Sequence, residues 1–454
     1  MIRYHHYLLP LIFALNFVAL GGRWNLPLAA WIVPVLVLYF YRRSGRPGRD
    51  FVLLWLATAI PLAVSWSGAT FFPRLGEIGF FFAAAPVALL AVAIDRRVHR
   101  RFPGSVWTLL AFPVAATALD YLQAGSSPFG TFGASAYSQR GFPVAMQLAA
   151  VGGIWGITWV MSLFASTVNA FWEGPASPPA WTAAGLLALA LALSLGRLLL
   201  PAPPPQTAVV AGFSLPEGTL AEVMGLFKSG DEAAFRRRSD ALHRAQLVQI
   251  RALAQDGADI VVLQEGGVMG STDQIETVLR NAAALAEEAG LYLVLPTFDF
   301  AQSPPVNGLR VIDPSGDVVL DHIKYGGNQF EGTRKGDGVL KSVETPFGTL
   351  GAVICWDADF PNIIRQTGAQ GVDLLIVPSQ DWYGVRDIHA AMASFRGVEN
   401  GLSIFRQTGQ GVSLVSDPYG RVLNRIDSFE ESRKDFVGIQ KVAVPIRSVN
   451  TLYP

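Results

Sequence analysis

The chain has 454 residues, of which 51% are hydrophobic and only 15% charged, and its 35 basic and 35 acidic residues give a formal net charge of zero. This length exceeds one typical domain, and the hydrophobic excess indicates a membrane-embedded part. Without a basic excess, nucleic acid is not expected as a partner. A single cysteine excludes an intramolecular disulfide and any multi-cysteine metal site, and the histidines are scattered apart from His5 and His6, so we expect neither metal nor cofactor.

The first 200 residues contain seven apolar stretches long enough to cross, or nearly cross, a bilayer. They cover residues 7–22, 24–41, 51–67, 78–94, 105–122, 144–168 and 180–200. So many successive stretches with almost no charge are not expected of buried helices in a soluble protein. We therefore predict a membrane domain of about seven helices over residues 1–200, whose first helix is retained rather than cleaved as a signal peptide.

Arginine clusters follow the second and the fourth of these stretches. They comprise Arg42, Arg43, Arg46 and Arg49, and then Arg96, Arg97, Arg100 and Arg101. The positive-inside rule makes both loops cytoplasmic, so an odd number of spans places the following domain outside the cytoplasm. The Gly/Ser-rich segment 126–138 falls on the same outer side, where it could help to shape a site or serve as a plain connector.

A proline-rich segment, residues 201–206, ends the last apolar stretch because proline lacks the amide donor. Beyond it, short β-rich runs alternate with helical stretches, so we predict an α/β catalytic domain over 207–445 and a tail over 446–454. The predicted strands are 208–211, 260–263, 292–295, 308–312, 318–320, 350–354, 374–377, 403–407 and 411–416, and the predicted helices are 235–255, 273–289, 363–370 and 389–399. Turn sequences at 313–316 and 417–420 indicate hairpins, which disfavours a purely parallel sheet.

Three residues with complementary chemistry, Glu265, Lys324 and Cys355, each follow a predicted strand. Ends of sheet strands are where α/β sites assemble. In that setting a thiol can act as nucleophile, a carboxylate as general base, and an ammonium group as stabiliser of thiolate and oxyanion. Taken alone, Cys355 could simply be a core cysteine, Glu265 a solvated acid and Lys324 a surface lysine. Lys335 and Lys341 are alternative candidates for the cation. Together, and with no GxSxG elbow in the sequence, Glu265, Lys324 and Cys355 predict an acyl-transfer site.

The order strand-Glu, strand-Lys and Ile-Cys-Trp-Asp-x-x-Phe-Pro, the last at residues 354–361, resembles the nitrilase superfamily of carbon-nitrogen hydrolases. With the multi-span domain in front, the whole chain resembles the apolipoprotein N-acyltransferase family. Further matching stretches are 127–133, 137–139, 377–384, 389, 396–401, 406–411 and 417–421. This resemblance implies a nitrilase-like α-β-β-α sandwich domain on the periplasmic side of a bacterial inner membrane.

The resemblance also implies roles for several residues. They are Glu265 as general base, Lys324 as oxyanion-stabilising cation, Cys355 as nucleophile, Glu331 as a supporting glutamate, Trp382 as a residue lining the site, and Trp356 and Asp357 as part of the cysteine motif. The implied reaction moves a fatty acyl chain from a phospholipid to a Cys355 thioester, and then to the α-amine of a lipoprotein's lipid-modified N-terminal cysteine. A dry site beside the bilayer would protect the thioester. The enzyme is expected to act as a monomer.

Departures from the family pattern keep two alternatives open. Residues 264–267 read Gln-Glu-Gly-Gly where Pro-Glu-x-Ala is usual, and Glu331 lies seven residues after Lys324 rather than eight. The Cys-Trp-Asp motif is closer to soluble nitrilases, which suggests a membrane-tethered amidase that hydrolyses a carbon-nitrogen bond, while the altered loops would suit a catalytically silent scaffold. The chain stops about where the family enters a final transmembrane helix, so either the sequence is truncated or that helix is absent.

Overall fold

The computed structural model describes residues 7–174, 177–199, 206–431 and 436–454. By contacts the chain divides into two compact units. The first comprises residues 1–127 and 131–201 with Tyr453, and the second comprises residues 128–130 and 202–452 with Pro454. The predicted linker 201–206 lies outside the described residues except for Gln206, which begins the first strand, so its boundaries stay a prediction.

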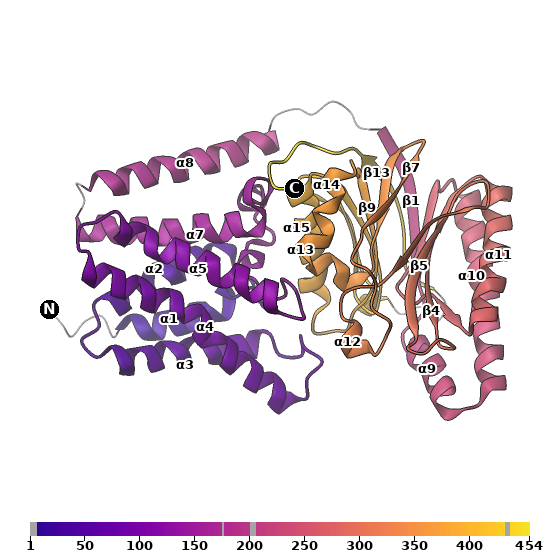
Figure 1. Cartoon of the computed structure of the whole chain (residues 1–454), viewed down its shortest axis with the longest axis horizontal. Helices are drawn as coiled ribbons and strands as arrows, with labels where there is room; N and C mark the ends of the chain where they lie inside the picture. Colours follow the sequence, from indigo (N-terminus) through magenta and orange to yellow (C-terminus); the bar gives the residue numbers. More distant parts are fainter. Residues whose placement is uncertain (1–6, 175–176, 200–205, 432–435) are drawn as a thin grey trace. The chain divides into compact units, whose positions relative to one another are not determined.

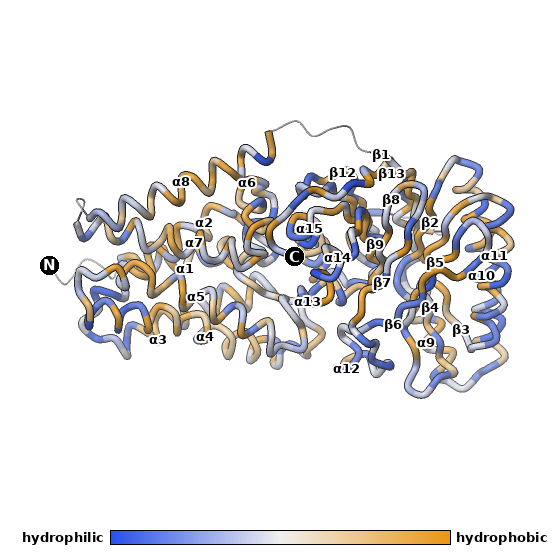
Figure 2. The backbone as a smooth tube through the Cα atoms, turned by 45° about the horizontal axis from the view of Figure 1, so that its top comes forward, coloured by the Kyte–Doolittle hydropathy of each residue, from blue (hydrophilic) through white to orange (hydrophobic). Residues whose placement is uncertain are grey.

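The first unit is built of helices (Figure 1). Those with more than ten residues are α1 (Leu8–Ala19), α2 (Pro27–Arg42), α3 (Pro47–Ser65), α4 (Arg74–Arg101), α5 (Trp107–Ser126), α7 (Ala149–Glu173) and α8 (Pro178–Leu199), one for each predicted apolar stretch. Four of them, α3, α4, α7 and α8, are long and apolar enough to cross a membrane, and Figure 2 shows hydrophobic residues along α3, α4 and α8. Helices α1 and α2 are apolar but shorter, so the count of seven spans stays a prediction.

Two predicted helical stretches are divided in the structure. The predicted helix 363–370 falls on two short helices, α13 (Pro361–Ile364) and α14 (Gln366–Ala369). The stretch 144–168 is divided between the short α6 (Pro143–Met146) and α7, and Gly152 and Gly153 inside α7 leave helical geometry. Gly153 has a φ of 62°, a conformation that costs glycine little but is unfavourable for other residues. The glycine pair therefore permits a kink that hydropathy alone does not predict.

Two sheets form the second unit, with strand orders β13-β1-β2-β4-β5-β6, to which β3 adds by pairing with β4, and β12-β11-β10-β9-β8-β7. The strands are β1 (Gln206–Ser214), β2 (Ile260–Leu263), β3 (Val268–Gly270), β4 (Tyr292–Asp299), β5 (Val306–Ile312), β6 (Val318–Ile323), β7 (Lys341–Thr345), β8 (Gly348–Ala352), β9 (Leu374–Gln380), β10 (Ser403–Gly409), β11 (Val412–Ser416), β12 (Val422–Asp427) and β13 (Val437–Ile446). Both sheets mix parallel and antiparallel pairs, which confirms that neither is purely parallel. Both predicted turns join antiparallel neighbours, β5 with β6 and β11 with β12.

Every residue of β2 is buried, because its alternate side chains enter two different apolar layers. Ile260 and Val262 belong to a core that also holds Ile354 and Ile376 from the region of the other sheet, so this core lies between the sheets. The intervening residues of β2 pack in a second core with helices α10 (Glu232–Gln255) and α11 (Thr272–Ala289). A third core joins the six-stranded sheet to α13 (Pro361–Ile364) and α15 (Arg386–Asn400). Figure 1 shows these helices flanking the sheets.

Candidate active site

Glu265 lies just beyond the end of β2 and is buried. Its Oε1 atom accepts hydrogen bonds from Asn307 Nδ2 at 2.8 Å and from Lys324 Nζ at 2.6 Å. Gly266, with a φ of 62°, turns the chain immediately afterwards. The carboxylate predicted as general base is thus held by donors from β5 and from the end of β6.

Lys324 directly follows β6, and its side chain is only 1% exposed. Besides Glu265, its ammonium group contacts the carboxylate of Glu331. Burial by itself would lower the pKa of Lys324, but the charges of the two carboxylates raise that pKa well above its usual value. Lys324 therefore stays charged and is available to stabilise a developing oxyanion.

Glu331 ends the short helix α12 (Asn328–Glu331), and its side chain is 29% exposed. Asn307 Nδ2 lies 3.5 Å from its Oε2 atom, so the same amide touches both glutamates. Burial raises the pKa of Glu331, and the charge of Glu265 raises it further against the opposing effect of Lys324. Two carboxylates thus share the ammonium group of Lys324, and Glu331 is the more exposed of the two.

The rival cations lie elsewhere. Lys335 Nζ sits over the ring of Tyr325, 4.3 Å from its centroid. Lys341 belongs to β7 and donates to the backbone oxygen of Asp321. Only Lys324 among these three lysines contacts Glu265, so the geometry favours it as the cation of the site.

Cys355 follows β8 and begins a short 3-10 helix, residues 355–359, with a φ of 48°. A left-handed φ in a residue other than glycine is strained and is often found at functional sites. The thiol is buried, and its Sγ lies 3.8 Å from the backbone oxygen of Gln380 at the end of β9. Burial, and then the charge of Glu265, raise the pKa of Cys355 well above its usual value, while Lys324 opposes them. The resting thiol is therefore protonated and needs a base.

Asp357 connects the cysteine turn to the loop that carries Lys324. Its Oδ1 atom accepts hydrogen bonds from the amides of Tyr325 and Gly326, at 2.9 and 2.7 Å. Its Oδ2 atom accepts from the amide of Ile354 at 3.0 Å and from His322 Nε2 at 2.7 Å. Asp357 is completely buried, and its hydrogen bonds tie the turn that carries Cys355 to the loop that begins at Lys324.

A second charged cluster also lies close to Cys355. Asp381 follows β9 and accepts hydrogen bonds from Arg406 at 2.8 and 2.9 Å and from His389 Nδ1 at 2.7 Å. His389 Nε2 lies 3.4 Å from Asp359. Burial would lower the pKa of His389, but the two aspartates raise it to about 9. The imidazole is therefore a cation at neutral pH.

Ligand atoms of Cys355, Asp381 and His389 lie within 4.8 Å of one another, a grouping that could hold a metal ion. The guanidinium of Arg406 already binds Asp381 through two hydrogen bonds and lies 3.2 Å from His389 Nδ1. A cation would have to displace another cation there, because these ligand atoms are already hydrogen-bonded. The arrangement therefore favours a hydrogen-bonded support for Cys355.

Aromatic side chains lie next to the cysteine turn. Residues 128–130 group by contacts with the second unit, and there the ring of Phe129 stacks on Phe330 at 5.0 Å, with Trp356 6.0 Å from each. Trp382 is half-buried two residues beyond Gln380. Its place in the wall of the site stays a prediction.

Several of these side chains were not predicted as site residues. Asn307 and His322 are polar residues at buried positions of β5 and β6, where buried polar groups need partners. Both lie just outside the predicted strands 308–312 and 318–320, so the predicted strands did not mark them. Asp359, His389 and Arg406 fall within or beside the stretches that carried the family resemblance. Their mutual contacts join residues far apart in the sequence, and local pattern gives no sign of such contacts.

Both halves of the chain match models of known protein families. Residues 177–449 match the family model described as carbon-nitrogen hydrolase, and residues 9–167 match the model described as apolipoprotein N-acyltransferase N-terminal domain. Because the first match covers more than half of the sequence, the chain belongs to the carbon-nitrogen hydrolase family. Within that family, the second match relates it to the nitrilase-type acyltransferases.

Individual relatives agree with this placement. An apolipoprotein N-acyltransferase of Pseudomonas aeruginosa is 26% identical over 452 residues, which cover 89% of this chain and 84% of the relative. An apolipoprotein N-acyltransferase of Rickettsia prowazekii is 31% identical over 116 residues, which cover 25% of this chain and 23% of the relative. Among solved structures, the match with an amidase from Nesterenkonia sp. has 19% identity and a TM-score of 0.39, and it covers 54% of this chain and 93% of the amidase chain. The match with a carbon-nitrogen hydrolase from Helicobacter pylori has 17% identity and a TM-score of 0.42, and it covers 53% of this chain and 90% of the hydrolase chain.

Proposed function

We propose that this chain transfers a fatty acyl group from a phospholipid, through a thioester on Cys355, to the N-terminal amine of an apolipoprotein. The two family matches and the relatives support lipoprotein N-acylation as the activity. The observation that carries the chemistry is the buried ion pair of Glu265 and Lys324, whose charges act on the buried thiol of Cys355. Because one chain supplies all three groups, the reaction requires no second subunit.

In the first half-reaction, Glu265 takes the thiol proton while the sulfur attacks the ester carbonyl of the phospholipid. Lys324 stabilises the negative charge that develops on the carbonyl oxygen. When the tetrahedral intermediate collapses, the ester C–O bond breaks and Glu265 returns the proton to the departing lysophospholipid oxygen. The products are an acyl thioester on Cys355 and a lysophospholipid.

In the second half-reaction, the free α-amine of the apolipoprotein attacks the thioester carbonyl. Glu265 accepts a proton from the amine, Lys324 again stabilises the oxyanion, and the C–S bond breaks. The sulfur regains a proton from Glu265, and the acyl group is left on the amine as an amide. Water that reached the thioester first would release free fatty acid, so apolar surroundings such as Trp356 and Phe330 favour transfer.

The proposed setting is a bacterial inner membrane, with the catalytic domain on the extracytoplasmic side. Within the first unit, Arg42 of α2 pairs with Asp95 of α4 at 2.8 Å, and Arg96 donates to the backbone oxygen of Ser44 at 2.9 Å. The helix ends that carry the two arginine clusters therefore lie together. This supports a common cytoplasmic side for both clusters, and an odd number of spans then carries the chain across.

The direct test is intact-protein mass spectrometry after incubation with phospholipid and no acceptor. We expect a mass increase of one fatty acyl group, removable by hydroxylamine and absent from a Cys355→Ser variant. A reactive thiol that gains no acyl group would rule out the proposal. Adding a lipid-modified peptide then separates transfer from hydrolysis: N-acyl peptide supports transfer, whereas free fatty acid alone would indicate the amidase alternative.

A further inference from the structure

Asp120 of α5 differs from the other acids of the first unit. The described part of that unit holds five acidic residues, and four of them pair with a cation: Asp95 and Glu173 with Arg42, Asp50 with Arg49, and Glu77 with Arg74. Within the described residues, Asp120 has no such partner. It accepts hydrogen bonds from the hydroxyl of Thr158 at 3.0 Å and from the amide and hydroxyl of Ser135, each at 3.3 Å. All three groups donate, as suits a carboxylate, which only accepts.

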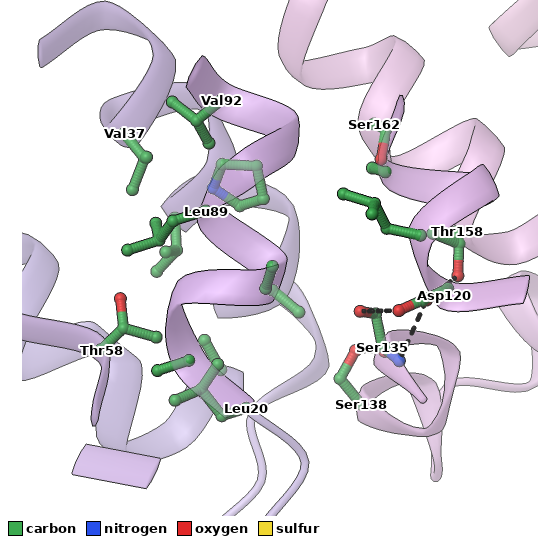
Figure 3. Close-up of a pocket in the computed structure, with 18 of the residues that line it drawn as sticks. Leu20, Val37, Thr58, Leu89, Val92, Asp120, Ser135, Ser138, Thr158 and Ser162 are labelled. Carbon is green, nitrogen blue, oxygen red and sulfur yellow. Dashed lines mark hydrogen bonds between the residues drawn. The ribbon is translucent and has the colours of Figure 1, made fainter. Parts of the chain in front are cut away.

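The side chain of Asp120 lines a cavity of about 250 Å³ enclosed by α1, α2, α3, α4, α5, α7 and the segment 133–138. In Figure 3, the apolar side chains of Leu20, Val37, Leu89 and Val92 lie on one side of this space. On the opposite side the same figure shows Asp120, Ser135, Thr158 and Ser162, with the hydrogen bonds to Asp120 drawn. One wall therefore suits an alkyl chain, and the other presents a single anionic group.

The charge of the lining restricts the chemistry of a ligand. No arginine, lysine or histidine is among the described residues that line the cavity. A phosphate or carboxylate head group would therefore face Asp120 without a compensating cation, and a neutral head would leave Asp120 uncompensated. An ionisable group inside a helical bundle is costly and is usually kept for function. A primary ammonium supplies the missing charge and up to three hydrogen-bond donors.

We propose that this cavity binds a membrane-soluble primary amine with an alkyl chain, its ammonium group on Asp120 and its chain along the wall that includes Leu89. The proposed acyl transfer assigns no role to the residues of this cavity, so the cavity is a second site, although the proposed acceptor is also a lipid-bearing primary amine. A lipid that carries a phosphate beside its amine is excluded by the same charge argument.

The test uses the whole chain with Cys355→Ser, purified in detergent and irradiated with hexadecylamine that carries a diazirine in its chain. Peptide mass spectrometry should find the label on lining residues of α4, α5 or α7. Asp120→Asn should reduce this labelling about tenfold or more, as expected for loss of a charge-assisted hydrogen bond, and Asp120→Glu should retain it. Equal labelling by the hexadecanol analogue, or labelling that Asp120→Asn leaves unchanged, would overturn the proposal.

Matched variants on α4 test the cavity itself. Ala88→Phe, at a residue that lines the cavity, should abolish labelling, whereas Ala83→Phe, at an equally exposed residue of the same helix outside the lining, should not. Stronger labelling by a diazirine-bearing ethanolamine phospholipid than by hexadecylamine would contradict the exclusion of phosphate. Because the Cys355→Ser background cannot form a thioester, a failure here is distinct from a failure of acyl transfer.

Discussion

The two sheets of the second unit contribute differently to the site around Cys355. Beside the seven-stranded sheet, Glu265 and Glu331 share the single cation Lys324, and Glu331 is partly exposed. Beside the six-stranded sheet, two acids and two cations balance in a cluster that is completely buried: Asp359, Asp381, His389 and Arg406. An unbalanced cluster with an excess carboxylate can accept a proton, whereas a balanced and saturated cluster fixes geometry. Neighbouring buried charges can therefore serve opposite purposes.

The largest expected effect is from Glu265→Gln, which removes the proposed base. Acyl transfer should fall by about 10²–10⁴-fold, the usual contribution of a general base. Because the charge of Glu265 raises the pKa of Cys355, the same variant should lower that pKa. The rate of iodoacetamide labelling, measured against pH, should therefore shift to lower pH while turnover is lost. A parallel loss of labelling and turnover at every pH would contradict the proposed role.

Lys324→Met should destabilise the second unit, because it leaves Glu265 and Glu331 together without their cation. Removing one partner of a buried ion pair costs about 3–5 kcal/mol. Chemical denaturation of the whole chain measures the loss, and the pKa of Cys355 should rise further. Adding Glu331→Gln to this variant should restore part of the stability. No recovery in the double variant would show that Glu331 and Lys324 are not energetically coupled.

His389→Gln tests whether the buried cluster holds its charges as the geometry implies. The folded pKa of His389, about 9, lies above the unfolded value near 6.5. Its stabilisation is therefore fully present below about pH 6.5 and is lost as the pH rises to about 9, on the order of 3 kcal/mol. The difference in unfolding free energy between the parent chain and the variant should shrink over this range. A difference that does not vary with pH would mean that His389 is neutral.

The smallest effect is expected from Lys341→Ala, a control for Lys324. Lys341 contacts only a backbone oxygen at an exposed position of β7 and does not reach Glu265. Transfer activity should stay within about twofold, and stability within about 0.5 kcal/mol, as is usual for surface substitutions. A loss comparable with that of Lys324→Met would reassign the cation of the site.

Much of the fold follows from local pattern. The run Ile260–Leu263 appears as a strand with the predicted bounds, because two buried faces need an uninterrupted apolar sequence. Four strands have no predicted counterpart: β3, β7, β12 and β13. The edge strands β7 and β12 have partly exposed residues that show no clear apolar run. The kink at Gly153 was missed as well, since hydropathy carries no information on φ.

Local sequence patterns are sufficient to predict the two-part organisation and the three residues of the proposed reaction. Each of those residues lies within three residues of the end of a strand, and strand ends are encoded locally. Three features appear only in the folded chain: the contact of Asn307 with both glutamates, the link that Asp357 forms between two loops, and the charge of His389. These features depend on contacts between residues far apart in the chain, such as the 42 positions between Asn307 and Glu265. Strand order and sheet packing create such contacts, and the local periodicity of hydrophobic residues predicts neither of them.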